Sequence, residues 1–98
     1  MALTKEIRTD LIEVLGQFKE IEIRTKTIIK EDGKVLSASL HRRPITCGDL
    51  DANNNLKPTD MSGETAEIQA VAAAVWTDSV KESYRQFLIA NLPKGFTP

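Results

Sequence analysis

Cysteine is almost absent from this sequence of 98 residues. Cys47 is the only one, so an internal disulfide cannot form, and assembly inside a cell fits better than secretion. His41 is the only histidine, and it is separated from Cys47 by Pro44, with no third group evident to orient it as a base. We therefore interpret Cys47 as a buried or tolerated thiol in preference to a nucleophile.

Aromatic side chains, net charge and long apolar runs are also scarce. Only 5% of the residues are aromatic, which leaves few large rigid side chains to bind a small molecule. The net charge of −1 provides no overall field that would attract nucleic acid or an anionic membrane. No apolar run approaches the ~18 residues of a membrane span, and the start MALTKEIRTD does not resemble a signal peptide. We expect a soluble protein whose partners are not membranes, nucleic acids or small-molecule substrates.

The most clearly patterned stretch is residues 21–43, IEIRTKTIIKEDGKVLSASLHRR. Asp32-Gly33 suits a two-residue type I′ turn, because both central positions of that turn need positive φ. Pairing Glu31 with Lys34 then gives one mostly apolar face, composed of Ile23, Thr25, Thr27, Ile29, Leu36, Ala38 and Leu40. We expect this face to support the C-terminal helices. The opposite face would gather a basic strip that is either solvated or an interface, made of Arg24, Lys26, His41 and Arg43.

Residues 7–15, IRTDLIEVL, fit two patterns. Ile7, Leu11 and Leu15 recur at helical spacing, whereas Ile12 and Val14 alternate as in a strand. A two-residue turn at Gly16-Gln17 would place Ile12 beside Ile21, and a third strand would stabilise a hairpin that is marginal by itself in water. We therefore predict an antiparallel β-meander over residues 5–44.

Residues 45–63 predict a long loop, because they are rich in Asp, Asn, Gly, Pro and Ser. Within it, residues 49–60 resemble the twelve-residue calcium loop of EF-hand and dockerin proteins. Asn54 replaces the usual Gly, and Lys57 adds a positive charge that opposes a cation. A metal-free turn is therefore the favoured alternative, and no other cofactor is predicted. The predicted calcium ligands are Asp49, Asp51, Asn53, Asn55 (through its carbonyl) and Asp60.

Residues 64–92 predict two helices. The first follows Ser62 or Thr65 as its cap, and Thr77-Asp78-Ser79 separates it from the second, whose apolar stripe includes Tyr84 and Phe87. Trp76, at the junction, is interpreted as a core anchor, with an interface role as the alternative. Residues 93–98 are predicted to form a flexible tail. The expected fold is a single α+β domain over residues 1–98, with a β-meander, a long loop and two C-terminal helices packed on the sheet.

The stretches IEIRTKTIIKEDGK, SLHRR and SGETAEIQAVAAAVWTDSVKESY together cover about half the chain. They resemble small uncharacterised proteins from the virion structural modules of tailed bacteriophages and prophages. The resemblance implies a tail, baseplate, connector or fibre-associated adaptor that is made in the host cytoplasm. It also implies other virion proteins and further copies of the chain, in a homo-oligomer, as partners.

Catalysis is not expected. The sequence contains no GxSxG, CxxC, P-loop or HExxH motif, and no nucleophile, base and orienting group come together in it. The alternative to a virion component is a small monomeric binding or regulatory module, either a domain with a calcium loop at residues 49–60 or a regulator that contacts a host protein or nucleic acid.

Overall fold

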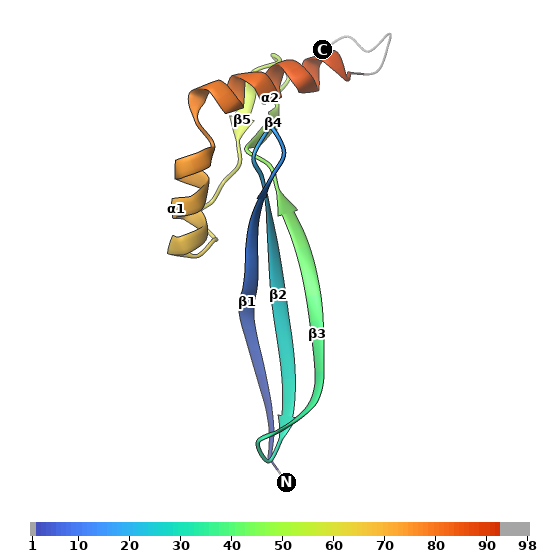
Figure 1. Cartoon of the computed structure of the whole chain (residues 1–98). Helices are drawn as coiled ribbons and strands as arrows, with labels where there is room; N and C mark the ends of the chain where they lie inside the picture. Colours follow the sequence, from blue (N-terminus) through green and yellow to red (C-terminus); the bar gives the residue numbers. More distant parts are fainter. Residues whose placement is uncertain (1, 93–98) are drawn as a thin grey trace.

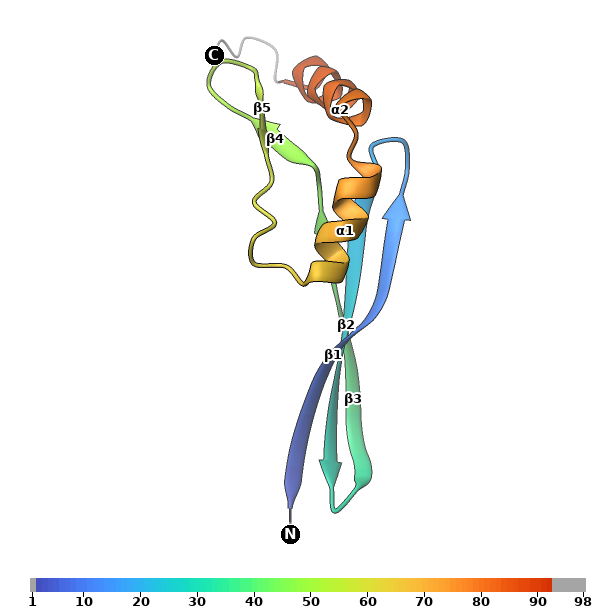
Figure 2. The same ribbon diagram turned by 90° about the vertical axis from the view of Figure 1, so that its left-hand side faces the viewer.

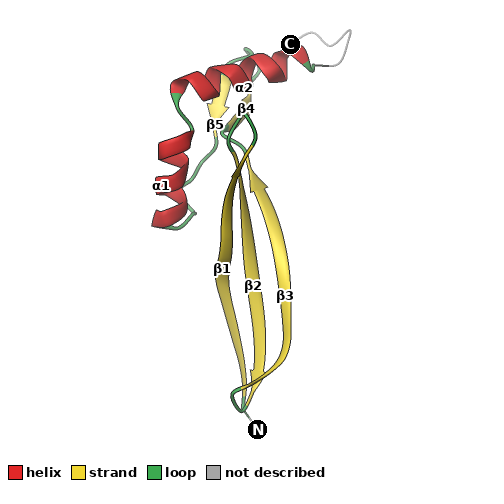
Figure 3. Ribbon diagram, viewed as in Figure 1, coloured by secondary structure: helices red, strands yellow, loops and turns green. Residues whose placement is uncertain are grey.

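The computed structural model describes residues 2–92, so the predicted flexible tail lies outside the described residues (Figure 1). A three-stranded antiparallel meander and a small hairpin precede two helices, which confirms the predicted α+β class (Figure 3). No helix in the described part of the chain is long and apolar enough to cross a membrane. The elements are β1 (Leu3–Leu15), β2 (Glu20–Glu31), β3 (Lys34–Ile45), β4 (Gly48–Leu50), β5 (Leu56–Pro58), α1 (Ala66–Val75) and α2 (Asp78–Ala90).

The molecule is strongly elongated, with extents of 60 × 30 × 22 Å and a radius of gyration of 18.2 Å. A compact domain of this length would have a radius of gyration of about 13 Å. The excess comes from the sheet, whose strands project far beyond the helices (Figures 1 and 2). We call the projecting part, residues 3–9, 25–31 and 34–41, the arm, and the rest of the described chain the head.

The turn between β2 and β3 is the predicted one. Asp32 and Gly33 have φ values of 49° and 83°, as a type I′ turn requires. The predicted pairing, however, is correct only next to the turn, because Leu36 is an extra residue in β3 and forms a bulge. Beyond the bulge every predicted pair is displaced by one residue, so His41 lies opposite Thr25. Such a slip moves each later side chain of β3 to the other face of the sheet.

The predicted third strand is confirmed, and β1 extends to Leu3. Its connection to β2 differs from the prediction, since four residues rather than two form the turn and Ile12 pairs with Ile23. Lys19 closes this turn at φ 53°, a conformation that favours glycine. The indole Nε1–H of Trp76 donates a hydrogen bond of 2.7 Å to the Lys19 carbonyl, which holds the turn against the helices.

The predicted loop contains a hairpin that the sequence did not indicate. The strands β4 and β5 pair directly, and the Asp51 carboxylate accepts hydrogen bonds from the backbone amides of Asn53 and Asn55, at 2.8 and 3.0 Å. Asn54 has φ 61°, and its carbonyl accepts a hydrogen bond of 2.9 Å from Arg85 of α2. This side-chain capping lets a short turn replace the predicted open loop.

The main cluster of core residues lies in the head. Ile21, Ile23, Ile45 and Cys47 pack with residues from α1 and its junction with α2, which are Ile68, Ala72 and Trp76. Of the two caps predicted for the first helix, the structure has Thr65 and not Ser62, and Thr77 caps the second helix. The hydroxyl oxygens of these threonines accept hydrogen bonds from the amides of Ile68 and Val80.

The helices do not cover the sheet as widely as predicted. Helix α1 lies beside the head end of the sheet, and α2 contacts β4 and β5 (Figure 2). No helix therefore covers the strand segments 25–29 and 36–40, whose apolar face was predicted to pack against the helices. On α2, Tyr84 and Phe87 instead contact Phe18 of the β1–β2 turn, with ring centroids 5.3 and 4.9 Å from that of Phe18.

Candidate interaction surface

The arm is the most unusual surface of the molecule because the head covers neither of its faces. Every arm residue of β1 and β3 is exposed, and in β2 only Ile28, at 6% exposure, is buried within the arm. Of the eight large apolar side chains that are exposed among the described residues, five lie on the arm. They are Leu3, Ile7, Val35, Leu36 and Leu40, and each is between 55% and 63% exposed.

The two faces of the arm differ in chemistry. Residues directly opposite each other in an antiparallel sheet point to the same face, so the pairing assigns each side chain. The Thr face continues the core-facing side of β2, and its charged residues are limited to Lys5, Glu31 and Lys34, near the β2–β3 turn. It also carries Leu3, Ile7, Thr9, Thr25, Thr27, Ile29, Ser37, Ser39 and His41. The charged face carries Glu6, Arg8, Lys26, Ile28, Lys30, Val35, Ala38 and Leu40.

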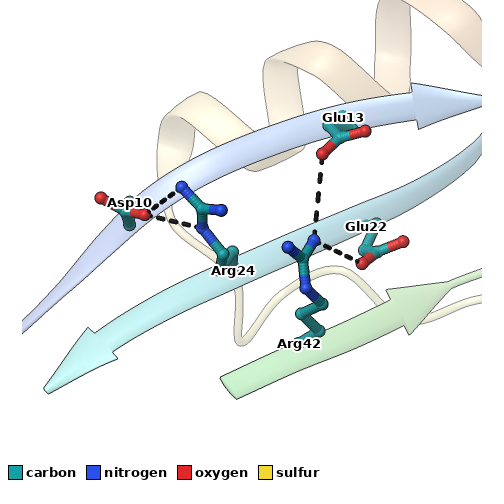
Figure 4. Close-up of polar contacts among 5 residues, drawn as sticks. All are labelled: Asp10, Glu13, Glu22, Arg24 and Arg42. Carbon is teal, nitrogen blue, oxygen red and sulfur yellow. Dashed lines mark hydrogen bonds and ion pairs between the residues drawn. The ribbon is translucent and has the colours of Figure 1, made fainter. Parts of the chain in front are cut away.

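A set of ion pairs links the strands where the arm meets the head (Figure 4). Asp10 is the extra residue of a bulge in β1, and its carboxylate accepts a hydrogen bond of 2.7 Å from Arg24 Nε. Arg42 Nη1 lies 3.1 Å from a carboxylate oxygen of Glu22 and 4.0 Å from one of Glu13. Exposed pairs of this kind contribute between about 0 and 1 kcal/mol each, so they favour correct strand pairing more than overall stability.

The predicted basic strip does not form. Arg24 and Lys26 point to the charged face, whereas the bulge at Leu36 places His41 and Arg43 on the face that continues into the core. That part of the prediction is wrong because one inserted residue turns the later side chains of β3 to the opposite face of the sheet. Trp76, the remaining interface candidate, is 7% exposed and lies in the core.

Arg43 instead joins β3 to the segment that precedes α1. Its Nη1 and Nη2 donate hydrogen bonds of 2.9 and 2.8 Å to the two carboxylate oxygens of Glu64. Hydrogen bonding to the carboxylate raises the pKa of Arg43 and lowers the pKa of Glu64. This bidentate pair fixes α1 against the sheet and leaves the Arg43 guanidinium engaged within the chain.

The predicted calcium ligands lie on and beside the β4–β5 hairpin. Asp51 caps its turn, while the Asp60 carboxylate accepts a hydrogen bond of 2.9 Å from the Ser62 amide, which lowers the pKa of Asp60. Among residues 2–92, no group of three or more His, Cys, Asp or Glu side chains gathers to hold a metal ion. Calcium binding by Asp49, Asp51, Asn53, Asn55 and Asp60 stays an untested alternative to the favoured metal-free turn, and the structure gives the carboxylates of Asp51 and Asp60 a capping role.

The described part of the head includes two hollows of note. One, of about 600 Å³, lies where the β1–β2 turn meets α2, and Leu15, Phe18 and Phe87 are among the residues that line it. The other, of about 410 Å³, includes Cys47, Trp76 and Lys81. Burial raises the pKa of the Cys47 thiol, and a protonated thiol is a poor nucleophile. This agrees with the interpretation of Cys47 as a core residue.

Comparison with known proteins provides no further identification. No family model, curated protein or solved structure matches this chain. We therefore base function on the geometry of the arm. One sequence signal could have revealed the arm earlier: a helix of ten residues spans about 15 Å, whereas strands of twelve residues span about 40 Å, so one cannot cover the other.

Proposed function

We propose that this chain is a non-enzymatic structural or adaptor component of a tailed-phage virion and acts through repeated protein–protein contacts. The observation that carries the proposal is the arm, a three-stranded sheet with exposed apolar side chains on both faces. Exposed large apolar side chains and free strand edges are features of proteins that associate with partners. The resemblance of the hairpin and helix sequences to virion structural proteins gives the partner class.

The energetics of the arm favour many contacts over a single one. Five large apolar side chains are each between 55% and 63% exposed. Full burial of one such side chain contributes ~1.5–3 kcal/mol, so covering only the exposed fraction of all five would contribute about 4 to 9 kcal/mol. Association itself opposes this by about 4 to 15 kcal/mol. These side chains alone therefore make a single contact weak, whereas several arms held in a symmetric particle gain from effective concentration. This comparison favours an assembly component over a monomeric regulator.

Mass spectrometry of purified particles, from a phage or prophage that encodes the chain, tests the proposal. We expect the chain in every preparation at a fixed ratio to the other structural proteins. Leu40→Ser, on the exposed arm, should reduce its incorporation, while Ala74→Ser, on an exposed position of α1, should not. Circular dichroism would verify that both variants fold. A chain that is absent from particles and monomeric at high concentration would instead support the monomeric binding or regulatory module.

A further inference from the structure

The two edges of the arm are not equally open. Within the arm, the β3 edge has a bulge at Leu36, and the basic residues 41–43 and Pro44 follow where the arm meets the head; each of these features opposes the addition of another strand. The β1 edge has none of them between Leu3 and Thr9. Those seven residues are regularly paired to β2, contain no proline, and are all exposed. A regular and exposed edge of this kind can accept a further strand.

The charges on this edge are complementary to themselves. When the strand pairs antiparallel with its own copy about a twofold axis at Ile7, Glu6 lies opposite Arg8 of the second copy, twice. An axis at Lys5, Glu6 or Arg8 would place identical charges opposite each other. An axis at Thr9 would carry the pairing across the bulge at Asp10. The axis at Ile7 pairs residues 5–9 with residues 5–9 of the second copy, and it is the longest register that stays clear of the bulge and sets opposite charges against each other.

We propose that the chain forms a symmetric dimer in which residues 5–9 of β1 pair with the same residues of a second copy, with the twofold axis at Ile7. This inference rests on the proposed function, because the dimer contact would be one of the repeated protein–protein contacts proposed above. The dimer joins the two arms into one six-stranded sheet. Because the contact is isologous, it joins two copies and no more. The free edges of the joined sheet are then the two β3 edges, which resist the addition of further strands.

Side-chain directions agree with this register. Residues opposite each other share a face, so the two Ile7 side chains, each 59% exposed in the single chain, would pack together on the Thr face. Glu6 and Arg8 would meet their partners on the charged face. Within one chain Glu6 has only long contacts, 3.7 Å to Arg8 and 4.0 Å to Lys30, so its carboxylate is available to the second copy.

Charge reversal provides the first test. Glu6→Arg and Arg8→Glu each place like charges opposite across the axis, so each variant alone should be monomeric where the wild type is dimeric. An equal mixture of the two variants restores both opposite-charge pairs and should form a heterodimer. The double variant Glu6→Arg/Arg8→Glu should dimerise with itself for the same reason. Sedimentation velocity over a range of concentrations would measure each mass, and rescue by mixing shows that the single variants are folded.

Disulfide trapping tests the register. Residues directly opposite in an antiparallel pair have Cα atoms about 4.5–5.5 Å apart, so Ile7→Cys should form a disulfide-linked dimer. Lys5→Cys should not, because two copies of that residue would lie about 13 Å apart across the axis. The natural thiol, Cys47, is 1% exposed. The amount of disulfide-linked dimer that the wild type forms through Cys47 is the background for both variants.

A wild-type chain that stays monomeric at every concentration, or equal trapping at both positions, would overturn the dimer. These outcomes are distinct from failure of the proposed function. A monomer that is still found in purified particles would overturn the dimer alone. A trapped dimer that is absent from particles would overturn the virion proposal and support the self-association.

Discussion

Replacing Trp76 with Phe tests whether one hydrogen bond fixes the sheet to the head. The indole Nε1–H donates to the carbonyl of Lys19, 57 residues earlier in the chain, at 2.7 Å. Lys19 has φ 53°, a left-handed conformation that is unfavourable by about 1–2 kcal/mol for a residue with a Cβ. The hydrogen bond therefore supports a strained turn, and Phe at position 76 would leave the Lys19 carbonyl without this donor.

The expected loss of stability has two parts. A lost hydrogen bond contributes about 1 kcal/mol. The phenyl ring is roughly 40 Å³ smaller than the indole, and at ~24 cal/mol per Å³ the resulting cavity adds about 1 kcal/mol. The side chain is 7% exposed, so solvent cannot easily fill the space. Trp76→Phe should therefore lower the free energy of unfolding by about 2 kcal/mol.

Urea denaturation followed by circular dichroism measures this change in both proteins, because it does not depend on tryptophan fluorescence. Ile68→Val is the matched control, since it removes one methylene from the same core cluster without any hydrogen bond and should destabilise by about 1 kcal/mol. Amide hydrogen exchange in the turn at residues 16–19 should accelerate in Trp76→Phe and not in Ile68→Val. If the two variants lose equal stability and the turn exchanges at the same rate, the hydrogen bond does not hold the turn.

Three further predictions concern the head. Gly48→Ala should destabilise the protein by about 2 kcal/mol, because an added Cβ would lie 2.5 Å from the carbonyl oxygen of residue 57; Gly63→Ala, where no atom lies within 4 Å, is the control in the same denaturation experiment. The ion pair with Arg43 lowers the pKa of Glu64, so it stabilises the fold fully above the ordinary glutamate value of 4.5 and less as the pH falls below it. In Glu64→Gln the free energy of unfolding should consequently fall less steeply between neutral and acidic pH than in the wild type. The difference should be less than about 1 kcal/mol, measured by denaturation at successive pH values. Millimolar calcium should leave the melting temperature unchanged, because acidic side chains of residues 49–60 already accept backbone hydrogen bonds; a rise that magnesium does not reproduce would establish the metal site.

Local chemistry made much of the fold predictable. Asp32-Gly33 specified its turn because few other residues tolerate positive φ at both positions. Thr65 and Thr77 marked the helix starts because a hydroxyl can satisfy a free amide there. Each of these signals depends on a few adjacent residues, and distant parts of the chain did not alter them.

The bulges were harder to predict because each is a single extra residue. Alternation continues normally on both sides of Leu36, so the sequence reads as one regular strand with a consistent face. A signal existed in the adjacent apolar pair Val35-Leu36, which a strand with one buried face would not require. The same limit affected the candidate surface, since the basic strip depended on the position of His41 relative to Arg24.

The exposed arm shows what hydrophobic alternation can and cannot specify. Alternation indicates that one face of a strand favours burial, but it does not identify the element that buries it. In the head, Ile21 and Ile23 are covered by α1 and the residues around Trp76. In the arm, Ile7 and Ile29 continue the same face of the sheet beyond the end of α1, which has only ten residues. Because residues 2–92 provide no element long enough to cover them, burial of this face requires surface from outside the described residues.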